Sequence, residues 1–257
     1  MKNNENRHQP KYQKCEKSKM KETNTLKQSI DCFDTKYREK GMQSQRSYPS
    51  EPMIQFIASN YFSVPPEERK DIRVLEVGSG SGANLWMLAK EGFDTYGLDS
   101  SEKGLELAKA HLKNKWDVVA KLTKGSFTEL PYDDNYFDAV VDVVSLQHIN
   151  LKDSEKALFE INRILKKGGR FFSYRLSDQS IMFKENVGEL VDSATLLNIE
   201  PPMPLSNNGP MSFWSIDLAN SMYKKANLEI DSIEKVKRTY AEGHVVEYLC
   251  ISSVSRK

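Results

Sequence analysis

The chain has 257 residues, 39% of them hydrophobic, and its 37 Lys and Arg residues nearly balance its 36 Asp and Glu residues. This length suits one α/β domain with added segments, and a formal net charge of +1 provides no general attraction to nucleic acid. No apolar run approaches the roughly 18 residues of a membrane span, and the N-terminus lacks the apolar core of a signal peptide.

The cysteine content argues against a disulfide framework or a zinc site. Cys15, Cys32 and Cys250 are odd in number and far apart, and no CxxC pair occurs. No paired carboxylates form the pattern of a Mg²⁺ site. We therefore expect no bound metal and a reducing, cytoplasmic environment.

Residues 1–28 differ in composition from the rest of the chain. They contain eight Lys or Arg residues against three Glu residues, and few apolar residues. Such a segment buries too little apolar surface to fold alone. We predict a disordered or loosely helical basic tail that is solvated, and contact with an acidic partner is the alternative.

From residue 29 onward, helical and strand-like patterns follow one another. The first two patterns are helical and cover residues 29–41 and 50–62, the second with Ser50 as its N-cap. The next elements, in chain order, are a strand over 72–77, a helix over 82–91, a strand over 93–99, a helix over 100–114, strands over 116–125 and 137–145, a helix over 153–169 and a strand over 170–176. This alternation predicts a parallel sheet.

After residue 177 the alternation loosens. We expect a helical insertion over 178–199, a loop over 200–210 and a helix over 213–227. Two consecutive strands, 228–240 and 243–254, would then close the sheet as an antiparallel pair.

A glycine turn follows the first strand of the predicted sheet. The sequence IRVLEVGSGSG places Gly78, Gly80 and Gly82 at alternate positions before a helix. Strand, glycine turn and helix together are how α/β proteins hold a nucleotide-like ligand. GSGSGA also fits the dinucleotide fingerprint, so the turn alone leaves the ligand open.

Two acidic residues beside the turn narrow the choice of ligand. Glu76 precedes Gly78 by two residues, where a carboxylate would repel a pyrophosphate but would accept a ligand with a positive charge. Asp99 follows Gly82 by 17 residues, at the tip of the second strand, where it can accept hydrogen bonds from ribose hydroxyls. The pair favours a charged nucleoside over a dinucleotide.

Residues of about 72–175 resemble the class I S-adenosylmethionine-dependent methyltransferases of the broad small-molecule type. The segments that carry the resemblance are LEVGSGSG, YGLDSS, GSFTELPYDDNYFDAVV, SLQHI and EINRILKKGGRFF. The resemblance implies a doubly wound α/β fold with a seven-stranded sheet in the order 3-2-1-4-5-7-6, strand 7 antiparallel. It also implies one methyltransferase domain over 29–257, with the cofactor core at 72–175 and acceptor-side elements at 29–65 and 177–215.

The resemblance also assigns cofactor-binding residues. They are Phe33, Tyr37, Glu76, Gly78, Ser79, Gly80, Gly82, Asp99, Ser100, Ser126, Phe127, Asp142 and Val143. Many members have an acid at the position of Ser126, which accepts from the adenine amino group. Ser126 would accept more weakly, and Phe127 would pack on the ring.

The chemistry implied is methyl transfer to an aligned nucleophile, for which a general base helps if the nucleophile is a hydroxyl or an ammonium group. His148 is the candidate base, against a role in packing its loop, and Asp142 is a candidate that could instead be a buried structural carboxylate. Candidate acceptor-binding residues are Arg46, Tyr48, Tyr174, Arg175, Phe213 and Trp214. His111 lies on a polar helix face and is expected to be solvated.

The sequence therefore predicts a methyltransferase that uses S-adenosyl-L-methionine and acts on an oxygen or nitrogen of a small-molecule or sugar-like acceptor. A nucleic acid or protein acceptor is the alternative within the class. The alternatives from other classes are an NAD-type oxidoreductase and a non-catalytic cofactor-binding protein. The sequence does not give the oligomeric state.

Overall fold

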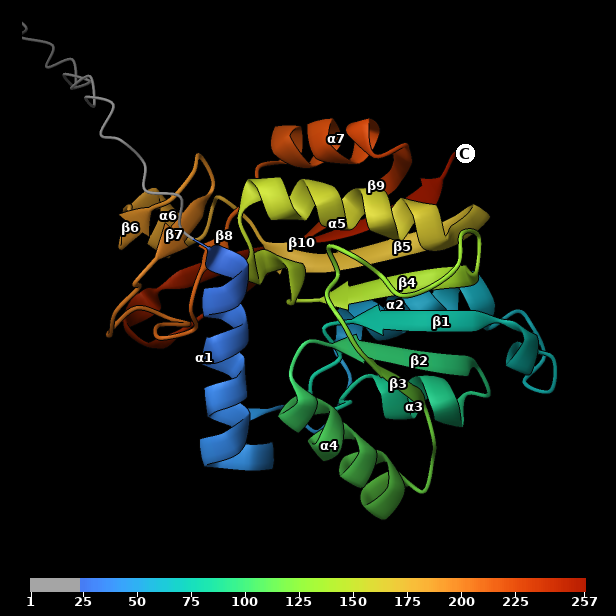
Figure 1. The fold of residues 1–257 in the computed structure, drawn as a ribbon. Helices are drawn as coiled ribbons and strands as arrows, with labels where there is room; N and C mark the ends of the chain where they lie inside the picture. Colours follow the sequence, from blue (N-terminus) through green and yellow to red (C-terminus); the bar gives the residue numbers. More distant parts are fainter. Residues whose placement is uncertain (1–23) are drawn as a thin grey trace, which may run out of the picture.

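The computed structural model describes residues 24–257, so most of the predicted tail and Cys15 lie outside the described residues. The chain forms a seven-stranded sheet in the order β3-β2-β1-β4-β5-β10-β9, which confirms the predicted order (Figure 1). Strands β1 to β5 are parallel to one another, and β10 is antiparallel to both β5 and β9. The strands are β1 Arg73–Val77, β2 Asp94–Asp99, β3 Lys121–Lys124, β4 Phe137–Val143, β5 Leu165–Leu176, β9 Leu228–Thr239 and β10 Val245–Ser255.

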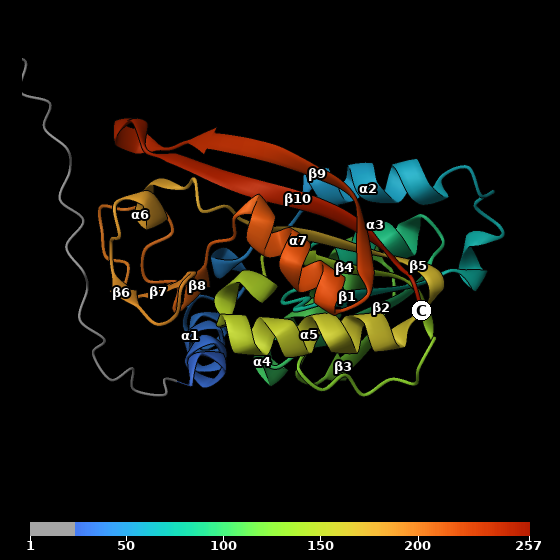
Figure 2. The ribbon, with the colours of Figure 1, turned by 90° about the horizontal axis from the view of Figure 1, so that it is seen from above.

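Helices pack on both faces of the sheet (Figure 2). One apolar core lies under α5 and α7, and the other lies under α2 and α3. β4 faces both cores, which explains why its sequence FDAVVDV is nearly continuous in apolar residues. The helices are α1 Thr25–Lys40, α2 Glu51–Tyr61, α3 Leu85–Lys90, α4 Glu102–His111, α5 Leu151–Ile164, α6 Ile181–Lys184 and α7 Ile216–Lys225.

Several element boundaries differ from those expected. The helix predicted to continue to residue 169 ends at Ile164, because Leu165 is already extended and pairs with Phe137 of β4. The strand expected from residue 116 begins at Lys121, because Leu112–Trp116 continues the preceding helix as a π-helical turn. At the N-terminus, Asn24 caps α1, so residues 25–28 of the predicted tail are helical.

The insertion over 178–199 is mostly not helical, which corrects that prediction. It contains the single short helix α6 and then β6 Glu189–Leu190 and β7 Thr195–Leu197. With β8 Met211–Ser212 these strands form a separate small antiparallel sheet. Asn186 and Asn198 have positive φ values, which a right-handed helix does not contain. They therefore prevent a longer helix in this segment.

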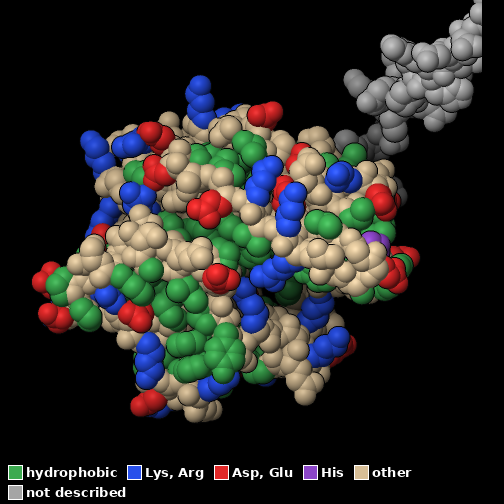
Figure 3. Space-filling model, turned by 180° about the vertical axis from the view of Figure 1, so that it is seen from behind, with side chains coloured by type: hydrophobic (Ala, Val, Ile, Leu, Met, Phe, Trp, Pro, Cys, Tyr) green, Lys and Arg blue, Asp and Glu red, His purple; other side chains and the backbone are tan. Residues whose placement is uncertain are grey.

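Helix α1 and the β6–β8 segment lie beyond the carboxyl ends of the parallel strands (Figure 1). Ligands of open α/β sheets bind at this edge. Seen from behind, basic and acidic side chains intermix over the surface (Figure 3), as the balanced charge leads one to expect. Among residues 24–257, no helix combines the length and apolar character needed to cross a membrane.

Candidate functional site

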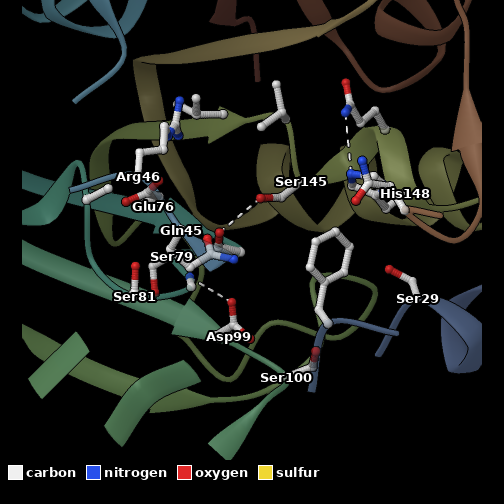
Figure 4. A pocket seen from close by; sticks show the side chains of 18 of the residues that line it. Ser29, Gln45, Arg46, Glu76, Ser79, Ser81, Asp99, Ser100, Ser145 and His148 are labelled. Atoms are coloured by element: carbon white, nitrogen blue, oxygen red, sulfur yellow. Dashed lines mark hydrogen bonds between the residues drawn. The ribbon is translucent and has the colours of Figure 1, made fainter. Parts of the chain in front are cut away.

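A pocket opens at the carboxyl edge of β1, β2 and β4, between the glycine turn and α1. Figure 4 shows Glu76 and Arg46 on one side of it, Ser29 and His148 on the opposite side, and Asp99 and Ser100 below. The pocket therefore has two halves. We call the part around the glycine turn, Glu76, Arg46 and Asp99 the turn half, and the part around His148 and α1 the helix half.

The glycines of the turn are required by their conformation and by close contacts. Gly78, Gly80 and Gly82 have φ values of +68°, +49° and +79°. A Cβ atom on Gly78 would lie 2.3 Å from the Cβ atom of Ser145, and one on Gly80 would lie 2.8 Å from the hydroxyl of Tyr37. Only glycine combines positive φ with such close packing. The glycines thus let Ser145 and Tyr37 pack directly against the backbone of the turn.

Buried polar atoms without partners gather around this turn. Within the described part of the chain, Glu76 Oε2, Ser79 Oγ and Ser81 Oγ are buried and have no hydrogen-bond partner. Buried polar groups in folded proteins almost always have partners, so a ligand with donors and a positive charge is the natural complement. Burial raises the pKa of Glu76 to about 8, against the opposing effects of Asn84 and the positive charge of Arg46.

Asp99 ends β2 and closes the lower part of the turn half. Its Oδ2 accepts a hydrogen bond from Gly80 N at 2.8 Å, and its Oδ1 accepts one from Ser101 N at 2.8 Å. Burial still raises its pKa above the ordinary value. The backbone bonds hold the carboxylate in one orientation, with lone pairs left for a ligand's hydroxyls.

Arg46 supplies the one guanidinium among the described residues that line the pocket. Its side chain stays partly open to solvent, but desolvation within the pocket lowers its pKa, and the largest opposing effect comes from Glu76. The turn half thus presents a carboxyl group and a guanidinium group side by side (Figure 4). That pattern fits the ammonium and carboxylate of an α-amino acid, and it moves Arg46 from the predicted acceptor side to the turn half.

Helix α1 covers the pocket with two aromatic residues that the sequence singled out. Phe33 and Tyr37 both line it, and the ring of Phe33 meets the ring of His148 edge-on, with centroids 4.8 Å apart. Asp34, between them, accepts a hydrogen bond from Ser101 Oγ at 2.6 Å. The helix is therefore tied to the start of α4, next to Asp99.

His148 lies in the helix half with a defined tautomer. Its Nδ1 lies 2.9 Å from the carbonyl oxygen of Pro210, which can only accept, so Nδ1 carries the proton. Burial lowers the pKa of His148 to about 4. At neutral pH the ring is uncharged, and Nε2 is an acceptor; the amide nitrogen of Gln147 lies 3.4 Å from it.

Three predicted cofactor residues do not line the pocket: Asp142, Ser126 and Gly82. Asp142 is fully buried and accepts from Ser145 N, Leu146 N and Ser173 Oγ at 2.9, 2.9 and 2.7 Å. It braces the loop after β4 instead of lining the pocket, whereas its neighbour Val143 does line it. Ser126 is also absent from the lining, because its hydroxyl turns toward Thr128 at 2.8 Å.

The remaining predicted residues divide between the pocket and the interior. Gly78, Ser79, Gly80, Ser100 and Phe127 line the pocket, whereas Gly82 packs against Ala108 of α4. The predicted acceptor residues Tyr174, Arg175, Phe213 and Trp214 are buried and do not line it. The Cζ atom of Arg175, for example, lies 3.3 Å from the centroid of the Trp214 ring. Their side chains point into the cores on the two faces of the sheet, and not toward the pocket at its carboxyl edge.

Tyr48 and His111 also differ from their predictions. Tyr48 is 60% exposed and sits edge-on against Trp86 and Trp116, outside the pocket. His111 is buried and not solvated, because its Nδ1 reaches the Ser81 carbonyl at 3.0 Å while Nε2 accepts from Trp116 Nε1 at 3.1 Å. It supports the glycine turn from behind.

Sequence reasoning missed several lining residues. They are Leu26, Ser29, Ile30, Ser44, Gln45, Ser81, Ala83, Asn84, Val144, Ser145, Gln147, Leu205, Asn208 and Tyr248. Ser145 and Gln147 belong to the SLQHI segment itself, so that segment was a usable signal for them. Leu205, Asn208 and Tyr248 come from segments far along the chain, and no local pattern marks them. Over residues 24–257, no cluster of three potential metal ligands occurs.

The order of the seven-stranded sheet is that of the class I S-adenosylmethionine-dependent methyltransferase fold, as the sequence predicted. Residues 75–173 match the family model described as "Methyltransferase domain". This match covers 99 of the 257 residues. The members of the class use S-adenosylmethionine as cofactor, and the unpartnered polar atoms of the turn half fit that group.

Curated relatives match the same part of the chain. A demethylmenaquinone methyltransferase of Tropheryma whipplei (strain Twist) is 35% identical over 97 residues, which is 38% of each chain. A ubiquinone biosynthesis O-methyltransferase of Pelagibacter ubique is 31% identical over 104 residues, 40% of this chain and 41% of the relative. The match thus spans about two fifths of these relatives.

Solved structures extend the likeness to nearly the whole fold. The 1,6-didemethyltoxoflavin-N1-methyltransferase of Burkholderia thailandensis, with that compound and S-adenosylhomocysteine bound, has a TM-score of 0.67 at 15% identity. The match covers 90% of this chain and 89% of that one. A methyltransferase of Methanosarcina mazei has a TM-score of 0.61 at 17% identity and covers 71% of this chain. At such identities the likeness concerns the fold.

Proposed function

We propose that this protein transfers a methyl group from S-adenosylmethionine to a hydroxyl oxygen on a small, largely apolar, ring-shaped acceptor. The observation that carries the proposal is the division of one pocket into two chemically different halves. The turn half offers charged and unpartnered groups. The helix half offers mainly apolar side chains, one neutral imidazole and the uncharged polar side chains of Ser29, Gln147 and Asn208.

In the turn half, each group of the cofactor has a complementary residue. Asp99 would accept from the ribose hydroxyls, and Phe127 would contact the adenine ring. Glu76 would accept from the α-ammonium group and Arg46 would donate to the α-carboxylate. When bound, S-adenosylmethionine supplies a sulfonium methyl group, whose carbon–sulfur bond breaks with its electron pair left on sulfur as the acceptor oxygen forms the new bond.

In the helix half, the lining favours an acceptor with little polar surface. Leu26, Ile30, Phe33 and Leu205 supply apolar walls, and no carboxylate or guanidinium among the described residues lines this half. A sugar-like acceptor would leave many hydroxyls unpaired here. A flat ring with one or two hydroxyl groups fits better. The quinone-related names of two relatives point in the same direction.

His148 is the group that takes the proton in this proposal. Its Nδ1 proton is fixed on the Pro210 carbonyl, so Nε2 is the atom available to accept a proton from the acceptor hydroxyl. Burial makes the imidazolium costly in the free protein. During transfer, however, the positive charge of the sulfonium is lost as that of the imidazolium forms, so the net charge in the pocket stays constant.

A methyl-transfer assay tests the proposal. The full chain is incubated with S-adenosylmethionine carrying a labelled methyl group and with matched panels of phenols, hydroquinones and sugars. We expect label in phenolic or quinol products and a loss of about a hundredfold in turnover with His148→Gln. Transfer only to sugars, or equal turnover by His148→Gln, would contradict the proposed acceptor or the proposed base.

A further inference from the structure

Asn84 occupies an unusual position beside the turn half. It lies at the N-cap of α3 and is 1% exposed, yet its side chain makes no capping hydrogen bond to the helix. A capping Asn ordinarily accepts from the first turn of its helix and stabilises it. Here the amide faces the pocket, where Nδ2 donates to Glu76 Oε1 and Oδ1 accepts from Ser50 N.

The two partners of Asn84 fix the orientation of its amide. Ser50 N can only donate, so the atom 2.9 Å from it must be the amide oxygen. The amide nitrogen therefore faces Glu76, and Oε1 of that carboxyl must accept. One oxygen of Glu76 is thus occupied, while Oε2 is buried without a partner and free for a ligand.

The bond to Ser50 links Asn84 to the segment that carries Arg46. Ser50 precedes α2, and residues 44–46 line the pocket just upstream. Trp86, two residues after Asn84, donates its indole N–H to the Ser47 carbonyl at 3.2 Å. α3 therefore holds the Arg46 segment at two points, and one of these points also holds Glu76.

We propose that Asn84 is a positioning residue, which sets the geometry between the anionic Glu76 and the cationic Arg46 so that the site selects ligands with a free α-amino acid end. The inference rests on the proposed function, because it concerns the end of the methyl donor that carries an ammonium and a carboxylate. Asn84 itself need not touch the ligand. It acts by orienting Glu76 and by anchoring the segment of Arg46.

A comparison of two ligands tests this role. S-adenosylhomocysteine carries the amino acid end, whereas 5′-methylthioadenosine shares the nucleoside and sulfur but lacks that end. Asn84→Asp keeps the size of the side chain but removes its donor and sets a second carboxyl against Glu76. We expect this variant to weaken the binding of S-adenosylhomocysteine by at least about tenfold. Its affinity for 5′-methylthioadenosine should change less than about twofold.

Asp99→Ala is the matched control, because it removes the predicted ribose contact and should weaken both ligands by similar factors. Asn84→Ala is the second variant, and its binding of 5′-methylthioadenosine also reports that the protein is folded. In a Glu76→Gln background, Asn84→Ala should reduce the affinity for S-adenosylhomocysteine much less than it does in the wild type, because the two residues act as a unit.

Equal weakening of both ligands by the Asn84 variants, or no weakening of S-adenosylhomocysteine, would overturn the positioning role. So would full additivity of Asn84→Ala and Glu76→Gln. Failure of the proposed function looks different: the wild-type chain would then bind neither ligand.

Discussion

The two halves of the pocket differ in how they are built and in how far the sequence defines them. Apart from Arg46, the turn half comes from β1, β2 and the turn between β1 and α3, all within 27 residues from Arg73 to Asp99. The helix half combines α1, the loop after β4 and the loop near residue 208. We propose that the turn half binds the cofactor, and its shape is set by backbone geometry that is local in the sequence. The helix half assembles distant segments, and this is where acceptor specificity can vary.

The largest expected effect concerns the helix half. His148→Gln keeps a polar side chain but removes the proton acceptor, so turnover should fall about a hundredfold. The dissociation constant of S-adenosylhomocysteine should stay the same, since His148 lies in the other half. Initial rates and calorimetric binding measured on the same preparation check both statements. A matching loss in binding would mean that the two halves are not independent.

The next effect concerns the turn half. Asp99→Ala should weaken the binding of S-adenosylhomocysteine by roughly 1–3 kcal/mol, because charge-assisted hydrogen bonds to the ribose are lost. Asp99→Asn serves as the milder comparison, since it retains one acceptor oxygen. Calorimetric titration gives the values. Unchanged affinity in both variants would remove Asp99 from the site.

The raised pKa of Glu76 predicts a pH dependence of ligand binding. A carboxyl with a pKa of about 8 is mostly protonated at pH 6 in the free protein, whereas an ammonium ligand needs the carboxylate. Affinity for S-adenosylhomocysteine should therefore rise by up to about tenfold per pH unit from pH 6 to pH 8. Glu76→Gln should flatten this profile, and 5′-methylthioadenosine should show none. A flat wild-type profile would argue against the ammonium contact.

The same residue predicts an effect on stability. The folded-state pKa of Glu76 lies above its ordinary value of 4.5, so folding favours the neutral carboxyl. Its contribution is fully present below pH 4.5 and is lost as pH rises toward 8. Glu76→Gln, which stays neutral, should lose less stability than the wild type over this range. Denaturant unfolding at several pH values measures the difference, and parallel curves would contradict it.

The smallest expected effect serves as a control for the boundary of the site. Tyr48 is largely exposed and packs against Trp86 and Trp116 outside the pocket. Tyr48→Ala should leave turnover and cofactor affinity within about twofold of the wild-type values, because surface substitutions away from special features change the free energy of unfolding little. A large loss of turnover would restore the sequence-based prediction that Tyr48 binds the acceptor.

The fold could be predicted from the sequence because its signals are local and agree with one another. The β-branched run of β4, the glycine turn and the helix after Asn150 each specify an element without help from distant residues. Boundaries failed where tertiary pairing overrode local preference. Leu165–Gly169 has a helical continuation pattern, but pairing with β4 draws it into β5.

The candidate site was predictable mainly in its turn half, and in the helix half only at Phe33, Tyr37 and His148. Glu76 and Asp99 occupy the ends of strands that the sequence predicts, and both line the pocket. The positions of Tyr174 and Arg175 on β5 suggested the same edge, but alternation along the strand turns them into the two cores. Asn84 gave no signal, because its importance lies in contacts with Ser50 and Glu76, which only the folded chain brings together.

Calorimetric titration of the full chain with S-adenosylhomocysteine tests the central claim most directly. The account predicts saturable binding at one site per chain, weakened by Asp99→Ala and left intact by His148→Gln. Absence of heat at millimolar ligand concentration, or affinity that Asp99→Ala leaves unchanged, would contradict the claim that this pocket holds the methyl donor.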